Sequence, residues 1–207
     1  MVKRRIKDLC VIIGLFLFSI FSFMTIYYMN EESKVKKEED IKIEEFFEEQ
    51  EEYIPEIAQE EQAEETKEEN KVNYTFVLEI PNIGLKKGFY GIGHMSNTVS
   101  KNIQMLDKSD YPDKEKGNVI LAAHNGSSSV SYFNKLDRLN IGDSIYLYYN
   151  GIKYEYKLDN MYDIVKTGKA SIKRNLNKNT ITLITCKKNT KDKQVVYIGY
   201  LNSKSNY

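Results

Sequence analysis

The sequence predicts an all-β domain, a closed barrel or a sandwich, that follows one membrane-spanning helix and an acidic linker. Short runs rich in β-branched residues and tyrosine recur along residues 71–207, with little helical periodicity between them. An uncharged apolar run lies near the N-terminus, and acidic residues dominate the segment between this run and the β domain. The chain of 207 residues therefore has three parts, although its formal net charge of zero conceals the differences between them.

Residues 9–30 form the uncharged run, which Leu, Ile, Phe and Val dominate. About 20 apolar residues are enough to span a bilayer, and a buried core helix is seldom apolar on every face. A cleaved signal peptide would have a shorter apolar region followed by a small-x-small site, whereas this run ends in Tyr27, Tyr28, Met29 and Asn30. We therefore expect an uncleaved transmembrane anchor.

The charges around the anchor predict its orientation. Basic residues are concentrated in residues 1–8, which the positive-inside rule keeps in the cytoplasm. The domain at 71–207 would then be extracellular, attached to the cell membrane by a single pass. It has 21 basic and 11 acidic residues, but this location excludes nucleic acid and favours an anionic wall polymer as the partner for that charge.

Residues 31–70 contain 18 acidic and five basic residues, one proline and no glycine. Too few apolar residues are present for a core, so we expect this linker to be disordered or to form an isolated frayed helix. Repulsion between its charges would extend it and hold the following domain away from the membrane.

The apolar runs of residues 71–207 mark the expected strands. Asn150-Gly151 separates two Tyr-rich alternating runs, which is typical of a β-hairpin with a type I′ turn. Residues 128–139 are the best candidate for a helix, because their apolar side chains recur at helical spacing. The expected strands fall within residues 73–80, 119–123, 144–149, 152–158, 161–166, 180–186 and 194–201.

The extracellular part contains a single cysteine, Cys186, at the end of an apolar run, and Cys10 lies in or beside the anchor. Exported proteins usually pair their cysteines, so an unpaired one is either a small buried hydrophobe or a reactive thiol. The strand end favours the reactive thiol, because it is rigid and accessible. Lys187 and Lys188 would in addition favour the thiolate.

The chain has two histidines. His94 lies in a Gly-flanked polar loop and is expected at the surface, whereas His124 ends another apolar run. A cysteine and a histidine at two strand ends are what a thiol nucleophile with a nearby acid or base requires. One cysteine and one or two histidines are too few for the usual four ligands of zinc. The sequence therefore predicts no metal site and no cofactor, and leaves calcium activation open.

Together these motifs resemble the sortase family, the cysteine transpeptidases of Gram-positive cell surfaces, over residues 76–202. TLITC at 182–186 matches the T-L-x-T-C signature around the family nucleophile, and the overall pattern is nearest to classes A and D. The resemblance implies a closed eight-stranded barrel. The other matching segments are LEIPNIGL at 78–85, GNVILAAHNG at 117–126, which contains the family histidine, and YFNKLDRLNIGD at 132–143 with the hairpin after it.

The resemblance also implies the reaction. Cys186 would attack the carbonyl between Thr and Gly of an LPXTG-like sorting signal, and His124, as imidazolium, would protonate the leaving amine. An amine of a cell-wall precursor or of a pilin lysine would then resolve the thioester. The residues expected to line the substrate groove are Thr185, Ala123, Asn125 and Lys193.

One position departs from the family pattern. Sortases have an arginine at the start of the strand after the cysteine loop, and here that position is Gln194. Its amide could still donate a hydrogen bond to an oxyanion, but not a charge-assisted bidentate contact, so Lys191 or Lys193 could supply the charge instead. The sequence leaves two alternatives to an active transpeptidase: a degenerate sortase fold that binds sorting signals or wall polymer without turnover, and an unrelated exported cysteine hydrolase.

Overall fold

The structure is a computed structural model that describes residues 2–51 and 73–207. The chain divides into two units, one that ends at Lys42 and one that extends from Ile43 to Tyr207. The remainder of the expected linker, from residue 52 onward, lies outside the described residues, so the prediction of disorder there stays a prediction.

The N-terminal part forms one helix, α1 (Val2–Glu51). Within it, Ile13–Glu49 contains a stretch that is apolar enough to cross a membrane. The helix continues through residues 31–51, the part of the acidic linker for which we expected either disorder or an isolated frayed helix. This stretch contains no Gly or Pro, its Glu and Lys are good helix formers, and Glu–Lys pairs such as Glu38–Lys42 lie at the supportive i,i+4 spacing.

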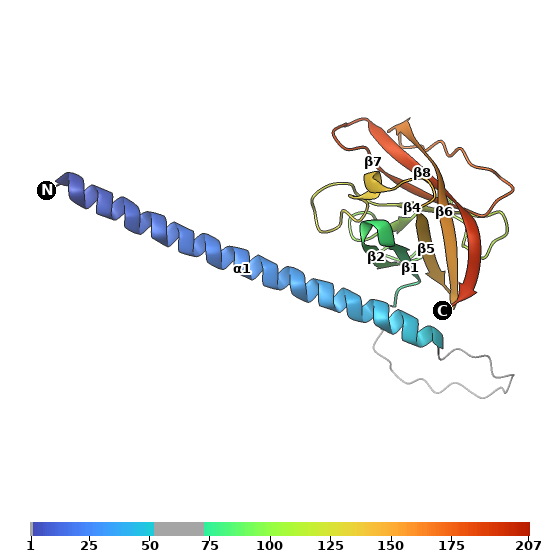
Figure 1. Cartoon of the computed structure of the whole chain (residues 1–207), viewed down its shortest axis with the longest axis horizontal. Helices are drawn as coiled ribbons and strands as arrows, with labels where there is room; N and C mark the ends of the chain where they lie inside the picture. Colours follow the sequence, from blue (N-terminus) through green and yellow to red (C-terminus); the bar gives the residue numbers. More distant parts are fainter. Residues whose placement is uncertain (1, 52–72) are drawn as a thin grey trace. The chain divides into compact units, whose positions relative to one another are not determined.

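Eight strands form one sheet in the order β2-β1-β5-β6-β8-β7-β4-β3 (Figure 1). A further bridge joins Tyr90, next to β2, with Gln104 in β3, so the two edge strands meet and the sheet is a nearly closed barrel. The predicted eight-stranded barrel is therefore confirmed. The strands are β1 (Phe76–Ile80), β2 (Leu85–Phe89), β3 (Gln104–Met105), β4 (Asn118–Ala122), β5 (Ser144–Tyr149), β6 (Ile152–Val165), β7 (Thr180–Cys186) and β8 (Lys193–Asn206).

The predicted hairpin joins β5 to β6. Its turn residues Asn150 and Gly151 have φ of 47° and 69°, the positive values that a type I′ turn requires. The runs expected as separate strands at 152–158 and 161–166 instead form the single strand β6. It pairs with β8 along its length, with register shifts between Glu155 and Tyr156 and between Leu158 and Asn160 (Figure 1).

The helix expected at residues 128–139 does not form. Apart from the short 3₁₀ turn η1 (Pro81–Ile83), the helical structure described in the barrel is a second such turn, η2 (Leu136–Arg138). Phe133, Leu136 and Leu139 are buried in the core at a spacing of three residues, which 3₁₀ turns satisfy. The preceding serines favour turns over helix, since their hydroxyls compete for backbone hydrogen bonds.

The interior of the barrel contains one basic side chain. Lys87 on β2 lies opposite the core residue Leu78 and is only 6% exposed. Its Nζ lies 4.6 Å from the centre of the Tyr132 ring. Burial lowers the pKa of Lys87 to about 8, because the ammonium loses hydration inside the barrel.

We predict that the free energy of unfolding rises by about 1–2 kcal/mol between pH 7.5 and 9.5 through Lys87. In this window the unfolded chain keeps the lysine proton and the folded chain releases it, so raising the pH favours the folded state. Denaturant titrations of the full chain in detergent micelles measure the slope. Lys87→Met should remove it and exposed Lys101→Met should retain it, and equal slopes in the two variants would contradict the assignment.

Candidate active site

The thiol and the imidazole lie at the ends of two neighbouring parallel strands. In the β4–β7 pair the last register partners are Ala122 and Ile184. His124 and Cys186 each lie two residues beyond those partners, and so they reach the same level of the sheet on the same face. Cys186 is half-buried and His124 is exposed.

Two side-chain hydrogen bonds hold the chain segments together beyond the last residue pair of β4 and β7. The Thr185 hydroxyl donates to the Ala123 carbonyl at 2.8 Å, and the Asn125 side-chain amide donates to the Cys186 carbonyl at 2.8 Å. The residues on both sides of His124 are therefore tied to the cysteine strand, which fixes the backbone of the histidine beside that of the thiol.

The third expected residue comes from the other neighbour of β7. In the antiparallel β7–β8 pair, Gln194 lies directly opposite Cys186. Such cross-strand partners have Cβ atoms about 5 Å apart and point to the same face. The structure thus brings together Cys186, His124 and Gln194, although the last is separated from the thiol by a loop and the histidine is 62 positions upstream.

An apolar patch extends from the thiol along the outer face of the barrel. Ile184 and Val196, one step along the same face from Cys186 and Gln194, are buried in it together with Ile120 and Ile198. The β6–β7 connection, residues 166–179, crosses this face: its Ile172 packs on the patch, and the Tyr162 hydroxyl accepts a hydrogen bond from the Lys173 N–H at 2.6 Å. Our sequence analysis missed this second apolar face.

Two of the residues expected to line the substrate groove lie elsewhere. The side chains of Thr185 and Ala123 are only 2% and 5% exposed. Alternation along a strand explains this, because the neighbours of Cys186 and His124 point into the barrel. Asn125 stays at the site, and its Oδ1 is buried without a hydrogen-bond partner among the described residues. Lys193 is exposed at the start of β8.

The lysines after the cysteine are engaged in ion pairs. Lys187 binds the Asp163 carboxylate, and the Lys188 Nζ lies 2.8 Å from Asp137 Oδ2. These carboxylates offset the positive charge that we expected at the thiol. His94 lies apart in its loop, stacked on Tyr90 with ring centres 4.0 Å apart. Among the described residues, no cluster of three or more His, Cys, Asp or Glu could hold a metal ion.

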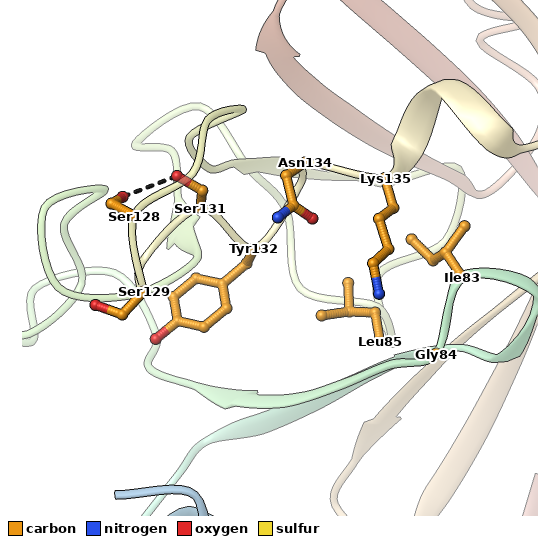
Figure 2. A pocket seen from close by; sticks show the side chains of 9 residues that line it. All are labelled: Ile83, Gly84, Leu85, Ser128, Ser129, Ser131, Tyr132, Asn134 and Lys135. Atoms are coloured by element: carbon orange, nitrogen blue, oxygen red, sulfur yellow. Dashed lines mark hydrogen bonds between the residues drawn. The ribbon is translucent and has the colours of Figure 1, made fainter. Parts of the chain in front are cut away.

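A separate pocket of about 230 Å³ lies between the start of β2 and the segment after the histidine (Figure 2). Figure 2 shows Tyr132, Asn134 and Lys135 on one wall and a hydrogen bond of 2.8 Å between Ser128 and Ser131. None of the three site residues lines it. Phe133, between the lining residues Tyr132 and Asn134, donates a backbone hydrogen bond of 3.1 Å to the His124 carbonyl.

Sequence comparison with known proteins relates this chain to one family. A family model described as the Sortase domain matches residues 78–201. Over 71 residues the chain is 39% identical to the sortase A of Bacillus anthracis, a match that covers 34% of this chain and about a third of that relative.

Solved structures of sortases have the same fold. The sortase A of Listeria monocytogenes is 24% identical, with a TM-score of 0.55 over 65% of this chain and 90% of that one. The sortase D5 transpeptidase of Clostridium perfringens is 21% identical, with a TM-score of 0.53 over 63% and 80%. The sortase C-1 of Actinomyces oris is 20% identical, with a TM-score of 0.57 over 69% and 83%.

We predict that Thr185→Val destabilises the chain by about 1 kcal/mol, the usual net value of a buried hydrogen bond, and lowers acylation of Cys186 several-fold. The matched control is Thr182→Val, which removes a 2.8 Å bond to Asn118 farther along the same strand. It should cost similar stability and leave acylation near the wild-type rate. Denaturant titration and peptide acylation followed by mass spectrometry measure both effects. Equal losses of acylation in the two variants would show that Thr185 does not position the site.

Proposed function

The chain belongs to the sortase family, whose members are transpeptidases, and we propose that it is a membrane-anchored cysteine transpeptidase that joins sorting-signal proteins to a surface amine. The observation that carries this proposal is the alignment of Cys186 with His124 on one side and Gln194 on the other. The proposed substrate is an LPXTG-like sorting signal. The proposed acceptor is an amine of a cell-wall precursor or a pilin.

The proposed chemistry is two acyl transfers. The Cys186 thiolate attacks the carbonyl carbon of the Thr–Gly bond, and the electron pair moves to the carbonyl oxygen. The tetrahedral intermediate collapses to a thioester while His124 donates a proton to the leaving amine. The acceptor amine then attacks the thioester, loses a proton to His124 and releases the thiolate. Two steps through a covalent intermediate replace one difficult amide exchange.

Gln194 is proposed to stabilise the oxyanion. The register pairing of Gln194 with Cys186 supports this role, because cross-strand partners share one face of the sheet. A neutral amide supplies a weaker hydrogen bond than a guanidinium does. Lys193, the residue before Gln194, is exposed at the start of β8. Adjacent strand residues point to opposite faces, so we assign the oxyanion contact to Gln194 and only a supplementary positive charge to Lys193.

The apolar part of α1 suits a single-pass anchor with an extracellular barrel. This location would hold the thiol near proteins that arrive at the cell surface. The proposed role of Cys186 as the nucleophile also accounts for its unpaired state, because a disulfide would consume the reactive thiol.

A second candidate is a sortase fold that binds sorting signals or wall polymer without turnover. Gln194 at the position of the family arginine is the specific observation in its favour. The two candidates differ in whether a covalent adduct forms.

We predict that the full chain in micelles, with Cys10→Ser so that Cys186 is its sole thiol, gains a peptidyl adduct when mixed with an LPXTG-type peptide. Intact-protein mass spectrometry detects the adduct, and peptide mapping places it on Cys186. Adding an amine should discharge it. Cys186→Ala should bind the peptide without an adduct. Binding without any adduct in the protein that retains Cys186 would favour the second candidate.

We predict that Gln194→Ala lowers turnover at least tenfold, roughly the loss of one oxyanion donor. Gln194→Arg should raise turnover above that of the natural chain, because the guanidinium adds a charge-assisted bond. Steady-state peptide cleavage measures both, and Gln194→Glu, which removes the donor at constant size, is the control. Turnover that is the same in all four proteins would assign the oxyanion to another group.

A further inference from the structure

The net positive charge of the barrel domain is concentrated in two connections. Residues 166–179, between β6 and β7, contain five basic residues and no acidic one. Residues 187–193, which run from the end of β7 to the first residue of β8, contain four lysines and one aspartate. We call these two connections together the cationic rim. Elsewhere in residues 73–207 the charges nearly balance, with 11 basic and 10 acidic residues.

The cationic rim adjoins the thiol. The Lys187 N–H donates to the Lys193 carbonyl at 2.9 Å, which closes the β7–β8 connection directly after Cys186. The Lys166 N–H donates to the Asp192 carbonyl at 2.7 Å, so the β6–β7 connection starts beside it. The β7–β8 connection and the start of the β6–β7 connection therefore lie at the same end of the sheet as Cys186, whereas the β6–β7 connection continues to the opposite end of β7 at Thr180.

Several rim charges already have partners. Lys187 and Lys188 are paired with Asp163 and Asp137. The ammonium of Lys178 lies 4.8 Å from the centre of the Tyr200 ring, and the Arg174 guanidinium donates to backbone carbonyls.

Within residues 2–51 and 73–207, four exposed rim lysines form neither an ion pair with an acidic side chain nor a contact with an aromatic ring, in contrast to Lys173 and Lys178, which lie over tyrosine rings. Like charges gathered in this way repel one another and create a positive potential that attracts anions. A ligand with negative charge would relieve the repulsion. These lysines are Lys166, Lys169, Lys191 and Lys193.

We propose that the cationic rim selects sorting signals that are flanked by acidic residues of the substrate protein, an inference that rests on the proposed function. The β7–β8 connection follows Cys186 directly, and the β6–β7 connection starts beside it. Residues that flank a signal bound at Cys186 would therefore pass close to the rim lysines. The partner is thus a peptide with Asp or Glu next to the motif, recognised by exposed lysines rather than by a closed pocket.

Exposed charge pairs are individually weak and are screened by salt. Several of them acting together mainly raise the rate of association. The effect should therefore appear in kcat/KM at low ionic strength and fade as salt is added, whereas the chemical step after binding should be insensitive to the flanks.

The test compares three peptides that share one sorting signal and carry Asp/Glu, Ser or Lys flanks, with the full chain in micelles. At 20 mM salt we expect acylation of Cys186 with a kcat/KM about tenfold higher for the acidic than for the neutral peptide, and lower still for the basic one. At 300 mM salt the difference should fall to about twofold. Peptides with acidic residues on one side only then identify the flank that the rim contacts.

Charge reversal in the rim gives the matched comparison. Lys166→Glu with Lys191→Glu, one residue from each connection, leaves two positive and two negative charges at the four positions without ion pairs. It should therefore remove most of the preference for the acidic peptide. Lys153→Glu with Lys204→Glu is the control, because these lysines lie at the far ends of β6 and β8 from the thiol. It should keep the preference of the natural chain.

The outcomes separate this inference from the proposed function. Equal kcat/KM for all three peptides, with the adduct formed, would overturn the inference and leave the function standing. Absence of the adduct with every peptide would remove the function itself, and the inference with it. If the peptides react equally but poly(glycerol phosphate) binds and loses affinity on reversal of Lys166 and Lys191, the rim binds polymer and the peptide assignment is wrong.

Discussion

The two pairings of β7 determine the site. Its parallel pairing with β4 brings His124 level with Cys186, and its antiparallel pairing with β8 places Gln194 opposite the same residue. A slip of one residue would turn the thiol to the opposite face of the sheet, into the barrel. The strand resists such a slip because both of its faces are buried: Ile181 and Leu183 lie in the interior, and Ile184 belongs to the apolar patch on the outer face.

Much of the fold could be predicted because its strands have strong local signals. The hairpin at Asn150-Gly151 and the apolar runs that end at His124 and Cys186 are examples. The strand β2 was missed, since its sequence LKKGF contains two lysines, one of which is buried. The helix expected at residues 128–139 failed for the opposite reason: its apolar residues have helical spacing, but tertiary contacts use them in turns.

The candidate site was predicted in part, and the division follows strand geometry. Residues at strand ends can be recognised in a sequence, and the structure brings all three of the expected reacting groups together. The register of the strands is needed to tell which neighbouring residues point to the same face as the reacting groups. Without it we expected Thr185 and Ala123 in the groove, although their side chains point inward. The carboxylates that pair with Lys187 and Lys188 come from distant strands and turns, so local charge counting could not reveal them. Lys166, Lys169, Lys191 and Lys193 of the rim have no such ion pair among the described residues, so the surface beside the thiol keeps a positive charge.

The most direct test of the account is whether the aligned thiol and imidazole turn over a sorting signal. Hydroxylamine intercepts a thioester and releases the acyl part as a hydroxamate, which is identified by its mass. The account predicts that the full chain converts an LPXTG-type peptide to the hydroxamate of its Thr-terminated fragment, and that His124→Ala reduces this conversion by at least a hundredfold. A chain that binds the peptide and yields no hydroxamate, or a His124→Ala variant as active as the natural chain, would contradict it.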